Sequence, residues 1–129
     1  MYIIIIVYII ITVIGCAFGG IVRHILTNFV NRLIGEQFPW GTLVVNSVGS
    51  FLLGLILGID LSSVDKPMSS FIGLGFCGGL TTFSTFSIET FRLVSKKAWY
   101  KASSNMLLSV LVCFFCVLVG HILGELATK

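Results

Sequence analysis

The sequence predicts an all-α membrane protein with four transmembrane helices per subunit, and three observations support this prediction. Hydrophobic residues make up 57% of the 129 residues, charged residues only 10%, and the mean hydropathy is +1.09. So few charges cannot cover the surface of a soluble domain of this length. The charges also divide the chain into four long uncharged windows, and the third window contains an unusual polar stretch.

The uncharged windows run from about 1–22, 37–59, 67–88 and 102–124. A bilayer is crossed by roughly 20 apolar residues in a helix, and each window has about that length. We therefore predict one domain over residues 1–129, with spans at about 2–31, 39–60, 68–95 and 99–126. Basic residues are scattered between the apolar windows, so no nucleic-acid partner is expected.

Glycine spacing predicts close packing between the spans. Glycines lie four residues apart in the first, second and fourth windows, and such pairs let helix backbones approach closely. These pairs are Gly15 and Gly19, Gly54 and Gly58, and Gly120 and Gly124. Arg23 follows one turn after Gly19, where it can snorkel, cap helix carbonyls or pair with another polar group.

The polar stretch Gly-Gly-Leu-Thr-Thr-Phe-Ser-Thr-Phe-Ser occupies residues 78–87 of the third window. In hydrocarbon an unpaired backbone group costs several kcal/mol, so polar or irregular chain survives only inside protein or along a cavity. The stretch therefore predicts a place where something hydrophilic binds or passes.

The polar groups within the spans suit an anion. Asn46 and Ser50 share a helical face in the second span, and their N–H and O–H groups can replace the water around an anion. Phe83 and Phe86 also share a face, and aromatic rings have positive edges that can contact an anion. Taken alone, two phenylalanines at this spacing are more often core residues of a helix, but their interleaving with Ser84, Thr85 and Ser87 weakens that interpretation. Uncharged donors favour conduction, because weak sites let an ion leave.

Other transport and catalytic mechanisms lack the residues that they need. The central part of each window contains no Asp or Glu, so a proton-coupled transporter is not supported. The chain also has neither a phosphate-binding loop nor a nucleophile–base pair, so we do not expect an enzyme. Passive conduction is the simplest remaining mode.

Three segments resemble the Fluc (CrcB-type) fluoride channels. They are the run Gly-Gly-Ile-Val-Arg ending at Arg23, the run Trp-Gly-Thr-Leu-Val-Val-Asn at 40–46, and the polar stretch 78–87. The resemblance covers essentially the whole chain. It implies a fluoride-selective passive channel in the cell (inner or plasma) membrane that exports cytoplasmic fluoride and relieves its toxicity.

The resemblance also implies an antiparallel, dual-topology homodimer with two pores at the subunit interface. By similarity, the ring edges of Phe83 and Phe86 and the amide of Asn46 would contact fluoride. Further candidate pore residues are Ser84, Thr85, Ser87, Asn105 and Ser109.

The third helix would break in mid-membrane at the polar stretch. The carbonyls of Gly78 and Thr81 from both subunits would then hold a structural sodium ion at the dimer centre, as unwound carbonyls do in interrupted membrane helices. Arg23 matches an arginine of the family with a structural or vestibular role.

The distribution of basic residues departs from the dual-topology ideal. Six basic residues lie in or near the connections between spans one and two and between spans three and four, against Lys66 and Lys129 on the opposite side. The six are Arg23, Arg32, Arg92, Lys96, Lys97 and Lys101. This bias favours one orientation with both termini outside.

Two other readings stay open at this point. A small multidrug-resistance-type exporter also has four short spans, but it would need a membrane-embedded Glu in span one, where this chain has none. A non-transporting membrane subunit would explain Ser and Thr as helix contacts, but not the spacing of Phe83 and Phe86 together with Asn46.

Overall fold

The structure is a computed structural model that describes residues 2–59 and 66–128. These residues form helices joined by short turns and irregular segments, and no strand occurs among them. The elements are α1 (Tyr2–Ile34), α2 (Trp40–Gly58), α3 (Lys66–Ser69), η1 (Ser70–Cys77), α4 (Gly78–Leu80), α5 (Phe83–Ser95) and α6 (Trp99–Ala127). The predicted connection between spans two and three falls largely on residues 60–65, which lie outside the described residues.

Within residues 2–59 and 66–128, four helical segments are long and apolar enough to cross a membrane: Tyr2–Ile34, Trp40–Gly58, Pro67–Ser95 and Trp99–Ala127. The prediction of an all-α protein with four membrane helices is confirmed, and the chain is a multi-pass membrane protein. The first helix continues to Ile34, beyond residue 31 where the sequence placed its end.

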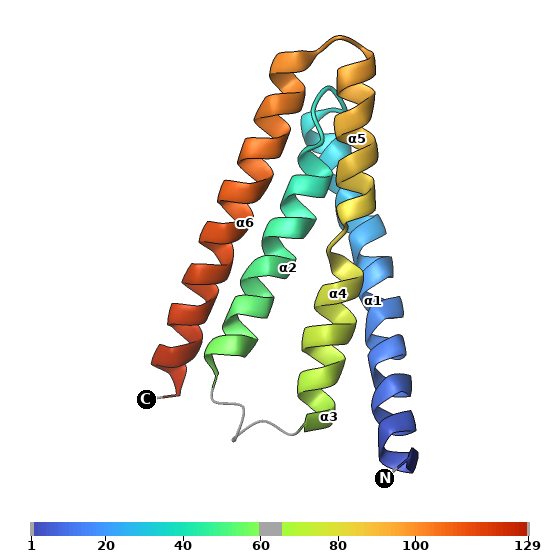
Figure 1. The fold of residues 1–129 in the computed structure, drawn as a ribbon, viewed down its shortest axis with the longest axis vertical. Coiled ribbons are helices and arrows are strands. Elements are labelled where there is room, and N and C mark those ends of the chain that lie inside the picture. The colour runs from blue at the N-terminus through green and yellow to red at the C-terminus, as the bar shows by residue number, and fades with distance from the viewer. Residues whose placement is uncertain (1, 60–65, 129) are drawn as a thin grey trace.

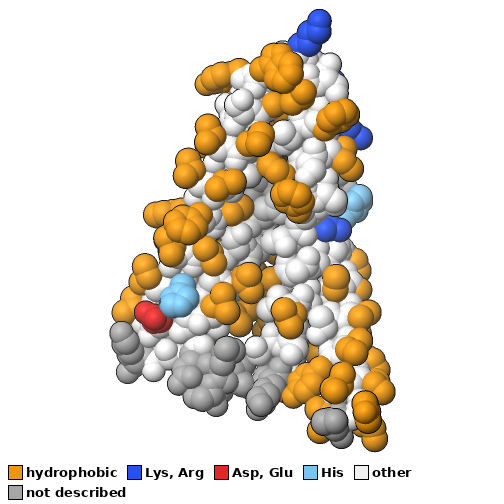
Figure 2. All heavy atoms as spheres, viewed as in Figure 1, with side chains coloured by type: hydrophobic (Ala, Val, Ile, Leu, Met, Phe, Trp, Pro, Cys, Tyr) orange, Lys and Arg blue, Asp and Glu red, His pale blue; other side chains and the backbone are white. Residues whose placement is uncertain are grey.

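The helices run alternately up and down, so that α1 begins and α6 ends at the same end of the molecule (Figure 1). α2 packs mainly against α6, while α1 packs against η1 and α4 of the third span. Apolar side chains are spread over the face shown in Figure 2, with backbone and other side chains between them, and single basic side chains stand at its upper end and along its right edge. This distribution is expected of a bundle that faces lipid.

Glycines form the contact between α2 and α6. A methyl group added at Gly54 would collide with the Val117 carbonyl oxygen, and one at Gly120 with the Phe51 carbonyl oxygen. The glycine pairs predicted in spans two and four are thus confirmed as packing positions. Their missing side chains let the two backbones touch.

A second glycine contact joins α1 to the third span. Gly15 faces Gly75, with 3.1 Å between a Cβ built on Gly15 and the Gly75 Cα, and Gly19 faces the carbonyl of Phe76. A methyl group on Gly79 would collide with the Cys16 carbonyl oxygen. The partner glycines on the third span were not identified from the sequence.

The third span is interrupted, as predicted. α4 ends at Leu80, Thr81 and Thr82 have extended backbone, and α5 begins at Phe83. Thr82 Oγ1 accepts a hydrogen bond from Thr85 N at 3.2 Å and so caps the new helix. The chain therefore ends one helix and starts another within two residues, and leaves backbone groups free at the break.

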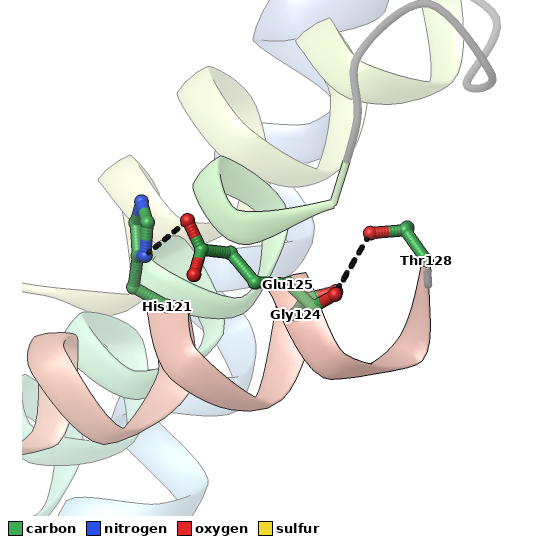
Figure 3. Close-up of polar contacts among 4 residues, drawn as sticks. All are labelled: His121, Gly124, Glu125 and Thr128. Carbon is green, nitrogen blue, oxygen red and sulfur yellow. Dashed lines mark hydrogen bonds and ion pairs between the residues drawn. The ribbon is translucent and has the colours of Figure 1, made fainter.

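The lower end of α6 is polar (Figure 3). His121 Nδ1 lies 3.8 Å from Glu125 Oε1, and Thr128 Oγ1 donates to the Gly124 carbonyl oxygen at 3.3 Å. The hydroxyl thus satisfies one of the last carbonyls of the helix. These exposed groups indicate where α6 leaves the apolar layer.

Candidate functional site

The side chain of Asn46, on α2, holds the backbone at the break in the third span through two hydrogen bonds. Its Oδ1 accepts a hydrogen bond from Thr82 N at 2.7 Å, and its Nδ2 donates to Thr82 O at 3.1 Å. The side-chain amide therefore pairs with one residue of extended backbone as a neighbouring strand would. Since Nδ2 carries two hydrogens, the second one is left for another acceptor.

This pairing frees a backbone carbonyl. In a continuous α-helix the Thr82 N–H would donate to the Gly78 carbonyl four residues earlier. Because it donates to Asn46 instead, Gly78 O loses that partner. Gly78 is exposed and a Cβ built there meets nothing within 4 Å, so its surroundings leave room for a ligand or a partner subunit.

Arg23 reaches the same break from α1. Its Nη1 donates to the Thr81 carbonyl oxygen at 3.2 Å. The contact depends on Gly19, one turn earlier, whose missing side chain lets α1 lie against the end of α4. Among the roles that the sequence left open for Arg23, this contact agrees with the capping of a helix carbonyl.

A cavity of about 500 Å³ adjoins the break. α2, the third span and α6 each contribute to its wall, and none of the lining residues is charged. The lining includes Asn46, Gly49, Ser50, Gly78, Thr81, Thr82, Phe83, Phe86, Ser109 and Cys113. The wall also includes the apolar residues Leu53, Leu74 and Val110, so small and uncharged polar groups share it with aliphatic side chains and two aromatic rings.

The two rings lie close together at the start of α5. Their centroids are 5.7 Å apart and their planes are inclined by 40°. Phe83 is 79% exposed, whereas Phe86 is partly buried. Most of the Phe83 ring is thus open at the surface of the subunit, beside the cavity that it lines.

Six of the predicted site residues line this cavity and five do not. The lining residues are Asn46, Gly78, Thr81, Phe83, Phe86 and Ser109. Of the others, Thr85 Oγ1 accepts from Thr82 Oγ1 at 3.0 Å, and Ser87 Oγ donates to Phe83 O at 2.9 Å. Ser84 is exposed on α5, and its Oγ is 3.3 Å from Thr82 Oγ1. Arg23 is the fourth residue outside the cavity, and it contacts the Thr81 carbonyl oxygen from α1.

Asn105 is the fifth residue outside the cavity. It is only 2% exposed, and its Nδ2 donates to Thr90 Oγ1 at 2.8 Å. Thr90 in turn donates to the Phe86 carbonyl oxygen at 2.8 Å. Asn105 thereby ties α6 to the helix that carries Phe86.

Sequence reasoning missed several residues of this region. Cys113 lines the cavity one turn after Ser109, and the spacing of four residues could have found it. Thr42 Oγ1 and Glu89 Oε2 are buried and have no hydrogen-bond partner among the described residues. Glu89 borders a second, polar pocket of about 350 Å³ near the upper end, together with Arg92 and Lys96.

The fold and the site define a small four-span membrane protein whose third helix is broken beside an uncharged, ring-lined cavity. Comparison with known proteins places it further: residues 10–121 match the family described as CrcB-like protein, Camphor Resistance (CrcB). The chain belongs to this family, and the resemblance noted in the sequence is confirmed.

Individual relatives agree with this assignment. The chain is 43% identical over 108 residues to a fluoride-specific ion channel FluC of Shewanella frigidimarina, covering 83% of this chain and 87% of the relative. A FluC of Trichlorobacter lovleyi is 47% identical over 109 residues, covering 83% and 87% of the two chains. A FluC of Geobacter metallireducens is 49% identical over 106 residues, covering 81% and 86%. These relatives are named as ion channels and not as enzymes.

Proposed function

We propose that this chain is a fluoride-selective passive channel. The observation that carries the proposal is the cavity beside the helix break, where an amide, hydroxyls and two phenylalanine rings meet without a charged residue. Such groups can replace part of the hydration shell of a small anion and still release it. The names of the relatives identify the anion as fluoride.

The proposed pore residues differ in how closely they adjoin the cavity. Asn46, Phe83, Phe86 and Ser109 line the cavity and form the core of the proposed fluoride path. Ser84, Thr85 and Ser87 lie on the same helix as the rings and would extend the path along α5. Asn105 remains a predicted pore residue, although its amide is engaged with Thr90.

A complete pore would require a second subunit. Phe83 is 79% exposed and Gly78 is open, so these two parts of the cavity wall are accessible to a second subunit. We propose an antiparallel homodimer in the cell membrane with two pores at its interface. Fluoride would leave the cytoplasm through these pores down its electrochemical gradient, which would relieve fluoride toxicity.

A sodium ion at the dimer centre is compatible with the residues present. Gly78 O lacks the helical N–H that would otherwise bond it, and both Gly78 and Thr81 line the cavity. Sodium binds to backbone carbonyls where membrane helices are interrupted. Two carbonyls from each subunit would hold the ion, and its charge would stabilise the four converging dipoles.

The channel proposal is tested by ion efflux from liposomes. Purified protein reconstituted in vesicles should release trapped fluoride rapidly, as read by a fluoride electrode, and chloride hardly at all. Protein-free vesicles control for leakage of hydrogen fluoride through the lipid. Equal release of both ions, or none of either, would contradict the proposal.

A further inference from the structure

Two different cations are candidates to bind the Thr81 carbonyl oxygen in this protein. Arg23 Nη1 donates to it at 3.2 Å, and the same oxygen belongs to the proposed sodium site. We propose that Arg23 and the sodium ion compete for this oxygen. The arginine holds the broken helix in the free subunit, and its charge weakens sodium binding in the dimer. This inference rests on the proposed sodium site.

The position of Arg23 follows from the packing of α1. Gly19 and Gly79 lie at the contact of α1 with α4, and an added Cβ on Gly19 would lie 2.8 Å from Leu80 N. With the backbones this close, a side chain one turn after Gly19 reaches the residue that follows Leu80. The guanidinium of Arg23 therefore reaches the Thr81 carbonyl oxygen at the break directly.

The charge of Arg23 is not neutralised by a carboxylate in the described part of the chain. Within residues 2–59 and 66–128 the ion pair observed is that of His121 and Glu125, far from Arg23 along the sequence. A cation at the C-terminal end of a helix is favourable, because the carbonyls there carry partial negative charge. Arg23 thus stabilises the break together with Asn46, before any ion is present.

A second cation at the same oxygen is opposed by repulsion. Two unit charges a few ångströms apart in a partly buried site repel strongly enough to weaken binding of the ion about tenfold or more. In an antiparallel dimer both copies of Arg23 would act on one ion. The arginine charge, and not only its hydrogen bond, should therefore set the sodium affinity.

Two substitutions separate charge from hydrogen bonding. Arg23→Gln removes the charge and keeps an N–H donor, whereas Arg23→Lys keeps the charge. Thermal unfolding of the purified dimer is followed while sodium replaces N-methyl-D-glucamine at constant ionic strength. We expect the half-saturating sodium concentration to fall about tenfold in Arg23→Gln and to change less than about threefold in Arg23→Lys. Unchanged or weaker sodium binding in Arg23→Gln would overturn the competition.

The wild-type channel gives an independent measurement if Arg23→Gln does not fold. In protein labelled with ¹⁵N-arginine, the side-chain N–H signals of Arg23 are identified by their absence from Arg23→Lys. They should shift on sodium addition with the midpoint seen in the unfolding titration. Signals that do not respond to sodium would overturn the inference.

Fluoride efflux keeps this inference distinct from the channel proposal. Selective efflux together with sodium-insensitive unfolding in every variant would overturn the competition and leave the channel standing. A sodium titration as expected, in a wild-type protein that releases no fluoride, would instead support the competition and contradict the channel.

Discussion

Asn46 uses its amide for two purposes at the scale of a single residue. One set of hydrogen bonds holds the Thr82 backbone, and the remaining Nδ2 hydrogen is left for the proposed ion. Asn46→Asp keeps the size of the side chain but replaces the donor by a carboxylate that faces Thr82 O. We expect unfolding to become easier by about 1–3 kcal/mol and fluoride efflux to fall by at least about tenfold.

The measurement for Asn46→Asp is fluoride efflux together with the midpoint of thermal unfolding. Ser47→Ala is the matched control, because Ser47 follows Asn46 on α2, donates to the Leu43 carbonyl oxygen at 2.7 Å and does not line the cavity. Normal efflux through Asn46→Asp would show that neither bond to Thr82 is needed for conduction.

Phe83 and Phe86 are expected to act through their ring edges. Isoleucine fills similar space but has no quadrupole, so Phe83→Ile and Phe86→Ile should each slow fluoride efflux by about tenfold or more while the dimer survives size-exclusion chromatography. Phe91 is 70% exposed on the same helix and does not line the cavity, so Phe91→Ile serves as the control. If all three variants conduct alike, the ring-edge role is wrong.

Substitution of Asn105 distinguishes a role in holding α6 against α5 from a role in the pore. Its amide is buried against Thr90, and Asn105→Ala should lower the free energy of unfolding by about 1–3 kcal/mol through the lost bond and the space left behind. A double-mutant cycle with Thr90→Ala should show coupling between the two residues. Lost efflux with unchanged stability would instead support the pore role predicted from the sequence.

At the scale of elements, the glycine contact between α2 and α6 sets how closely these helices pack. Gly54→Ala would place a methyl group against the Val117 backbone, and overpacking of this kind typically costs about 1–3 kcal/mol. Gly20 has nothing within 4 Å of its Cβ position, so Gly20→Ala should leave stability unchanged or raise it by about 0.5–1 kcal/mol. Unfolding midpoints in detergent compare the two, and similar midpoints would contradict the packing argument.

The elements that could be predicted from the sequence are those marked by polarity. Gaps between charges located the four spans. The glycine and hydroxyl residues of 78–87 marked a polar stretch in the third span, and the resemblance to the fluoride channels implied the break there. Helix pairing could not be predicted in this way, because lipid-facing and protein-facing surfaces are both apolar and hydropathy does not distinguish them. The contact of α1 with Gly75 and Gly79 was therefore missed.

The directions of the side chains within the site could not be predicted from the sequence either. Asn105 and Ser109 are one turn apart on α6, yet Ser109 lines the cavity and Asn105 is buried against α5. The two directions differ because Thr90 offers a hydrogen-bond partner to the first residue, and that partner lies in a different helix. A tertiary contact thus determines the direction of the Asn105 side chain, and helical periodicity alone does not predict that contact.

At the scale of the whole molecule, charge and pore geometry favour different arrangements. Among the basic residues whose exposure the structure describes, five exposed ones lie at one end of the bundle, where α1 meets α2 and α5 meets α6: Arg32, Arg92, Lys96, Lys97 and Lys101. Such a bias favours a single orientation in the membrane. The open cavity wall instead suits an antiparallel partner, which requires both orientations from one chain.

Reporter fusions at the C-terminus decide between these arrangements, because α6 ends at the same end of the molecule where α1 begins. Alkaline phosphatase is active only outside the bacterial inner membrane and green fluorescent protein fluoresces chiefly inside, so a dual-topology chain should give both signals. Replacing Lys96 and Lys97 by Gln weakens the basic bias and should bring the signals closer to equal. A signal from only one side, in the wild type and in this variant, would contradict a homodimer built from two orientations of this chain.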